Sequence, residues 1–103
     1  MFKLCVYIPH DHVGAVKAAM FAAGAGRIGD YEHCCWQVLG QGQFKPLEGS
    51  DPYIGQQDVV EQVAEYRVEM ICKEDAIVEV VSALKRAHPY EEPAYDVMRL
   101  ESF

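Results

Sequence analysis

The strongest constraint on the fold is the order in which two hydrophobic periodicities follow one another along the chain. Residues 2–8 and 60–72 alternate between apolar and more polar side chains, the period of a strand with one buried face. Each of these segments is followed by apolar residues three or four positions apart, the period of a helix packed along one side. These two helical stripes are Val13, Val16, Met20 and Ala23, then Ile77, Val80, Val81 and Leu84.

Two further strands complete the pattern. Residues 31–39 are predicted as the second strand and residues 94–100 as the last, which we place at a sheet edge because Pro93 lacks an N–H donor. The order strand, helix, strand, strand, helix, strand predicts an α+β, ferredoxin-like fold. In that fold a four-stranded antiparallel sheet carries two helices on one face. With 103 residues, we expect residues 1–103 to form one domain.

Two helices can cover only one face of such a sheet. More apolar side chains alternate along the predicted strands than the covered face has room for, so part of the set must lie on the other face. A monomer would then expose an apolar patch of unusual size, and burial against other copies is the simplest remedy. We therefore predict a homo-oligomer. The apolar set is Tyr7, Trp36, Val38, Val63, Ile71, Tyr95 and Val97.

The charge of the chain excludes some partners. Nine Lys and Arg residues against sixteen Asp and Glu residues give a formal net charge of −7, which repels nucleic-acid phosphates and anionic membranes. The N-terminus predicts no signal peptide, and no apolar run reaches the roughly 18 residues of a membrane span. None of the four cysteines forms a C-x-x-C pair. We therefore expect free thiols in a reducing cytosol.

The glycine-rich segment 40–55 is too irregular for a strand or helix and is long for a hairpin connection. Loops of this length are often functional. One interpretation is an ordered loop that packs its own aromatic residues or a neighbouring subunit. The other is a recognition loop for a ligand or protein partner, with Gly42, Phe44 and Lys45 as binding residues.

A second glycine-rich segment, residues 24–29, follows a helix and precedes a strand. A dinucleotide-binding fingerprint needs the reverse order, so the structural interpretation is a helix end and a tight turn. The alternative is an anion site at a subunit boundary, formed by Arg27 and backbone amides that include Gly29.

Histidine and cysteine residues offer one candidate metal site. His33 and Cys35 would share one face of the predicted strand, and they supply half of the four ligands of a closed site. His88 with Glu91, or with Glu92 in its place, could supply the rest across a subunit interface, for a divalent ion. The alternative is structural: His33 as a partly buried strand residue and His88 as a cation at a helix C-terminus.

Residues 88–96 carry three carboxylates and two tyrosines between and beside two prolines. We interpret this run as a rigid subunit-contact connector whose tyrosine hydroxyls bond to carboxylates. No Ser-His-Asp or Cys-His constellation stands out, so a binding module is favoured over an enzyme.

Two stretches carry a family resemblance. The first runs Gly24-Ala25-Gly26-Arg27-Ile28-Gly29-Asp30-Tyr31, with Cys34, then Gly40-Gln41-Gly42-Gln43-Phe44-Lys45-Pro46, Gly49, Pro52 and Gly55. The second is His88-Pro89-Tyr90-Glu91-Glu92-Pro93-Ala94-Tyr95-Asp96. Together they resemble the domain inserted in the middle of YqfO-type proteins, of the NGG-one-interacting factor three-like dimetal-binding family. The chain is similar to a stand-alone copy of that insert.

The resemblance implies a fold like those of the CutA and PII signalling proteins, which are ferredoxin-like trimers. It places loop 40–55 where PII proteins have their effector loop, and His88-Pro89-Tyr90-Glu91 resembles the C-terminal signature of CutA. The family's two metals are bound by flanking domains, so their ligands do not transfer to this chain. We expect a non-enzymatic, oligomeric module, a trimer before a dimer, that binds a small ligand or metal ion and presents the loop to a partner. The alternatives are a metal-dependent hydrolase-like enzyme and a purely structural trimeriser.

Overall fold

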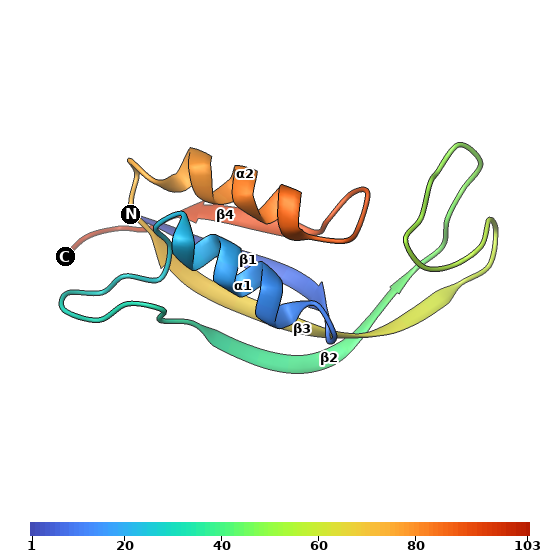
Figure 1. Ribbon diagram of the computed structural model, residues 1–103, viewed down its shortest axis with the longest axis horizontal. Helices are drawn as coiled ribbons and strands as arrows, with labels where there is room; N and C mark the ends of the chain where they lie inside the picture. Colours follow the sequence, from blue (N-terminus) through green and yellow to red (C-terminus); the bar gives the residue numbers. More distant parts are fainter.

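The computed structural model describes residues 1–103 and contains four strands and two helices (Figure 1). In chain order they are β1 (Phe2–Pro9), α1 (Val13–Ala22), β2 (Trp36–Phe44), β3 (Glu61–Cys72), α2 (Ile77–Ala87) and β4 (Tyr95–Arg99). The strands form one antiparallel sheet in the order β2-β3-β1-β4, and both helices lie on the same face of it (Figure 1). The predicted ferredoxin-like fold is confirmed, as is the position of β4 at a sheet edge.

The core lies between the sheet and the two helices. Leu4, Val6 and Ile8 of β1 point toward the helices and are completely buried, as the alternation of this strand predicts. The apolar stripes of α1 and α2 pack against these three side chains. Neither helix is long and apolar enough to cross a membrane. The buried members of the two stripes are Val16, Met20, Val80 and Leu84.

The second strand was predicted five residues too early. It begins at Trp36 instead of Tyr31 and continues through Gly40 and Gly42 to Phe44. The residues before it are held in a turn-rich segment, because the Gly26 N–H donates to the Ile71 carbonyl at 2.8 Å and the Gly26 carbonyl accepts the Cys34 N–H at 2.8 Å. Backbone pairing with β3 overrides the weak strand preference of the two glycines, so the long loop spans residues 45–60 and not 40–55.

The uncovered face of the sheet carries both apolar and charged groups. The strand register places Tyr7, Trp36, Val38, Val63 and Ile71 on this face. The other two members of the set, Tyr95 and Val97, lie on the helix side, because they pair with Val6 and Leu4. Part of the apolar set therefore lies on the uncovered face, as predicted.

A short chain of ion pairs crosses the middle of the uncovered face. Glu69 accepts from Arg67 at 2.8 Å and lies 3.4 Å from the Lys3 ammonium. Trp36 lies beside this group and is 59% exposed. The uncovered face therefore carries charged groups among its apolar side chains.

Two valines of α2 allow a matched test of the core. Val80 is completely buried and Val78 is 75% exposed on the same helix. We expect Val80→Ala to lower the free energy of unfolding by about 2 kcal/mol, because it removes two buried methyl groups and leaves a cavity. Val78→Ala should change it by less than about 0.5 kcal/mol. Urea denaturation at one protein concentration measures both, and equal midpoints would contradict this packing.

Candidate functional site

The site lies where β2 and β3 extend beyond the rest of the sheet (Figure 1). The pairing of β1 with β3 stops at Pro9 opposite Glu65, whereas β2 and β3 stay paired as far as Phe44 opposite Glu61. Loop 45–60 follows this projecting hairpin, and the connector of residues 88–94 turns back toward it after α2. A cavity of about 410 Å³ lies between the loop and the connector. Its lining includes Phe44, Lys45, Pro46, Tyr53, Glu65, Tyr90, Glu91 and Glu92.

Tyr90 is the central side chain of this cavity. Its hydroxyl donates to Oε2 of Glu65 on β3 at 3.0 Å, so the connector is tied to the sheet. Burial, together with the hydrogen bond to Glu65 and the charge of that carboxylate, raises the pKa of Tyr90 well above its ordinary value. The hydroxyl therefore stays protonated and acts as a donor. The sequence-based prediction of a tyrosine–carboxylate bond is confirmed at Tyr90, although the carboxylate comes from β3 and not from the connector.

His88 fixes the start of the connector. Tyr90 N–H donates to Nδ1 of His88 at 3.1 Å, and Nε2 lies 2.8 Å from the Tyr7 carbonyl of β1. This pattern assigns the proton to Nε2 and makes the ring neutral, with both nitrogens in use. Burial lowers the pKa of His88, which also favours the neutral form. The alternative interpretation of His88 as a charged group at a helix end does not fit these contacts.

The tip of the loop is tied to the connector. The backbone N–H of Asp51 donates to the Glu91 carboxylate, at 3.2 Å to Oε2 and 3.4 Å to Oε1. Two further bonds close the loop on itself: Asp58 N–H to the Pro46 carbonyl at 2.7 Å and the Ser50 hydroxyl to the Leu47 carbonyl at 2.6 Å. The cavity therefore has walls defined by hydrogen bonds.

Gly42 makes room for the Glu65 side chain. A Cβ added at Gly42 would overlap the Glu65 carboxylate, whereas a Cβ at Gly40 would meet nothing within 4 Å. The position of Glu65, and through it that of Tyr90, depends on the missing side chain at residue 42.

The predicted ligand-binding residues divide into two groups. Phe44 and Lys45 line the cavity. Gly42 does not line it, but it lies against the Glu65 side chain, which does. Arg27 and Gly29 lie elsewhere, in the segment that joins α1 to β2, where a bridge between Ile28 and Tyr31 makes a tight turn. Ligand binding by these residues stays a prediction.

The predicted metal ligands are not brought together within one chain. His33 stacks on Phe21 at the end of α1, with ring centroids 4.8 Å apart, whereas His88 contacts Tyr7 at the end of β1. No group of three or more His, Cys, Asp or Glu side chains has metal-binding geometry. His33 and Cys35 also precede β2, so the shared strand face assumed for them does not exist. A metal site with His88 and Glu91 would need residues of separate chains, and it stays a prediction.

Sequence analysis missed Glu65 as part of the site and included Tyr53 only among the aromatic residues of the loop, not as a binding residue. Glu65 belongs to the charged face of an alternating strand, which has the same pattern as an ordinary solvated face. The run His88-Pro89-Tyr90-Glu91-Glu92-Pro93 gave the available signal, because two prolines around a tyrosine indicate a fixed connector.

Proteins with similar sequences are much longer than this chain. It is 52% identical over 98 residues to a GTP cyclohydrolase 1 type 2 homolog of Mycobacterium leprae, covering 95% of this chain and 26% of that protein. It is 43% identical to the protein of the same name from Bacillus subtilis, covering 96% of this chain and 26% of the relative. The chain therefore spans about a quarter of the length of the curated relatives it matches. No family model matches the sequence.

Solved structures of two kinds of protein share the fold of this chain. A Bacillus cereus protein related to NIF3 superposes with a TM-score of 0.83 at 40% identity, covering 98% of this chain and 26% of that one. The divalent cation tolerance protein CutA of Archaeoglobus fulgidus superposes with a TM-score of 0.69 at 15% identity, covering 100% of this chain and 87% of that one. The CutA likeness concerns the fold alone.

Gly42 and Gly40 provide a matched pair for the Tyr90–Glu65 contact. Gly40→Ala should raise the free energy of unfolding by about 0.5–1 kcal/mol, because alanine loses less backbone entropy on folding. Gly42→Ala should be less stable than Gly40→Ala by about 1–2 kcal/mol, because the added methyl group displaces the Glu65 carboxylate from Tyr90.

Urea denaturation compares the two variants, and an NMR titration follows the Tyr90 ring. Gly42→Ala should move the pKa of Tyr90 down toward the ordinary tyrosine value. Equal stabilities and an unchanged Tyr90 titration would show that Glu65 does not depend on Gly42.

Proposed function

We propose that this chain, a homologue over 95% of its length of one segment of the NIF3-related proteins, is a non-catalytic module that binds a small molecule beneath loop 45–60. The homology and the CutA-like fold support a small regulatory or binding module. The observation that carries the proposal is the cavity of about 410 Å³ between the loop and the connector. This volume falls within the roughly 300–1,000 Å³ of small-molecule sites.

The contacts of Tyr90 in the cavity, and of His88 beside it, favour binding over acid–base catalysis. The Tyr90 hydroxyl is held as a donor to Glu65, and its raised pKa keeps it from acting as a base. Both nitrogens of His88 are engaged by backbone groups. Tyr90 and His88 are thus used to hold the connector in place.

The loop gives the module a way to report binding. Its tip meets the connector through Asp51 and Glu91, both of which are exposed. A ligand that contacts both walls would stabilise this closure, and the outer side of loop 45–60 would then present a changed surface to a protein partner.

Ligand binding is tested by NMR with the isotope-labelled chain and a set of cationic, neutral and anionic fragment-sized compounds. We expect the amide shifts caused by binding compounds to centre on residues 44–54 and 90–94. Tyr53→Ala should abolish these shifts because it removes a wall of the cavity. Tyr31→Ala is the control, since Tyr31 is 74% exposed in a separate turn. Shifts that map elsewhere, or no binding by any compound, would contradict the proposal.

We also propose that copies of the chain associate through the uncovered sheet face, as a homo-oligomer of three copies before two. Support comes from the exposed apolar side chains on that face and its flank at β4, among them Trp36, Val38 and Met98. The ion pairs around Glu69 lie among them and would be partly shielded from water by a second copy.

Light scattering after size-exclusion chromatography should give a multiple of the 11.6 kDa chain mass. Val38→Lys should shift the chain toward monomer, because it places a charge in the contact surface. Val78→Lys, on the outer side of α2, should leave the mass unchanged. A monomeric wild-type chain at micromolar concentration would refute association.

A further inference from the structure

Three aromatic rings and three carboxylates meet in the cavity beneath loop 45–60. Building on the proposed function, we propose that this cavity is an aromatic cage for an organic ammonium cation, a methylated or quaternary amine. The rings are those of Phe44, Tyr53 and Tyr90, and the carboxylates are those of Glu65, Glu91 and Glu92. The inference concerns the chemical class of the ligand, which neither the fold nor the homology supplies.

The rings are arranged around Tyr90. The centroids of Phe44 and Tyr90 are 5.9 Å apart with planes at 56°, and those of Tyr53 and Tyr90 are 6.4 Å apart with planes at 46°. Rings tilted in this way leave parts of their faces available to a third group, whereas parallel stacked rings cover one another. A cation binds a ring face within about 6 Å of the centroid. Because the Phe44 and Tyr53 centroids lie only 5.9 and 6.4 Å from that of Tyr90, one cation can lie within this distance of Tyr90 and of a neighbouring ring.

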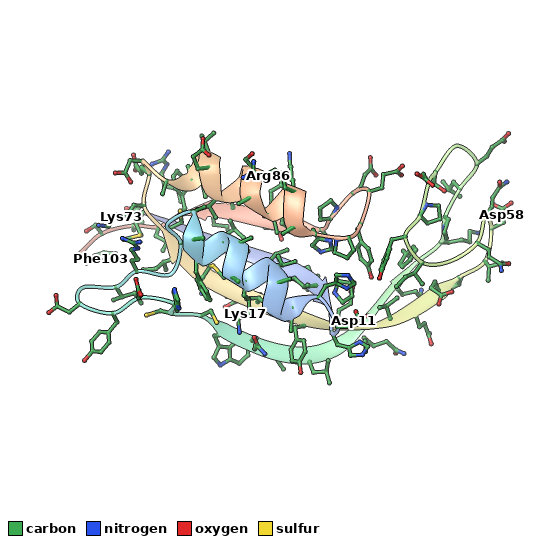
Figure 2. All side chains as sticks on the ribbon, viewed as in Figure 1. Asp11, Lys17, Asp58, Lys73, Arg86 and Phe103 are labelled. Carbon is green, nitrogen blue, oxygen red and sulfur yellow. The ribbon has the colours of Figure 1, made fainter.

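The three rings come from separate parts of the chain: the end of β2, the loop and the connector. Figure 2 shows side chains from the loop and the connector projecting into the space between these two segments. The rings are supported from outside the cage. His12 contacts the Tyr53 ring edge to face, with centroids 5.4 Å apart and planes at 86°, and the His88 ring lies 4.9 Å from that of Tyr90. Such support reduces the entropy lost when a ligand orders the site.

Two cations of the chain bind rings outside the cavity. Lys85 lies over Tyr95, and Arg99 lies over Phe2. Lys45 is the one basic residue that lines the cavity, and it makes no such contact with a ring there. No Lys or Arg of the chain therefore makes a cation–π contact with the three rings of the cavity.

The charge around the rings selects a cation. Three carboxylates line the cavity against the single ammonium of Lys45, and the chain as a whole has a net charge of −7. Aromatic walls suit a weakly hydrated organic cation, because a small hard metal ion needs converging oxygen ligands instead. The Tyr90 hydroxyl already donates to Glu65, which keeps this ring in place while one carboxylate remains beside the cage.

The decisive comparison uses two probes of the same shape. Choline carries a quaternary nitrogen, and 3,3-dimethyl-1-butanol has a carbon atom in its place. We expect NMR titration to show choline binding with shifts in the rings of Phe44, Tyr53 and Tyr90. The neutral probe should bind at least about 5-fold more weakly, because only the cation is attracted to the ring faces and carboxylates.

Variants of Tyr53 and Lys45 test whether choline binds against the rings of the cavity. Tyr53→Leu should weaken choline binding about 5- to 30-fold, whereas Tyr53→Phe, which keeps the ring, should weaken it less than about 3-fold. Tyr53 is 50% exposed, so neither change should prevent folding, and circular dichroism checks this. Lys45→Gln should strengthen choline binding by removing the one like charge.

The outcomes separate the two proposals. Equal affinities for choline and its neutral counterpart, or an equal loss in Tyr53→Leu and Tyr53→Phe, would overturn the ammonium cage. If neutral or anionic fragments still bound at residues 44–54 and 90–94, the proposed ligand-binding function would stand without it. If no compound of any charge bound there, both proposals would fail.

Discussion

The unequal length of the strand pairs is the constraint from which the site follows. β3 is long enough to pair with β1 over one stretch and to continue beside β2 after β1 has ended at Pro9. The last part of this hairpin has no helix above it and no neighbour on its second side. Its side chains need other partners, and loop 45–60 and the connector after α2 supply them. A cavity forms because the loop contacts the connector at Asp51 and Glu91, and the connector contacts the sheet at Tyr90 and Glu65, while the space between these contacts stays unfilled.

Tyr90 joins the parts that define this cavity. Its backbone is bound by His88, its hydroxyl by Glu65, and its ring lies near those of Phe44 and Tyr53. Tyr90 therefore contacts the sheet, the end of β2 and the loop, and the His88–Tyr7 and Asp51–Glu91 hydrogen bonds add two further ties between the connector and these segments. The neutral state of His88 belongs to the same arrangement, because a proton at Nδ1 would remove the acceptor for the Tyr90 N–H.

The uncovered face of the sheet carries both charged and apolar side chains. Lys3 and Arg67 both pair with Glu69 along the middle strands, and exposed apolar groups such as Trp36 and Val38 lie at the side toward the β2 edge. An isolated pair of surface ions contributes little stability in water. The arrangement therefore suits a face that can meet water or another copy of the chain, with the apolar side as the part that gains most from contact.

The sequence by itself determined the order of the elements and the covered face of the sheet. The period-two pattern of β1 and the stripes of α1 and α2 depend on local geometry, and side chains such as Val6, Met20 and Leu84 could be assigned to the core from spacing alone. The start of β2 could not be found this way, because Gly40 and Gly42 are poor strand residues and only pairing with β3 makes them extended.

The site was visible only in fragments, through the connector run around Tyr90 and the aromatic residues of the loop. The tertiary structure alone decided that Glu65, Phe44, Tyr53 and Tyr90 meet, because residues far apart in the chain come together through strand register and loop closure. It also separated His33 from His88, which sequence analysis had considered as joint metal ligands, by placing them beside the end of α1 and the end of β1. Local periodicity records which face a side chain takes, whereas distances between segments are set by packing that no local pattern contains.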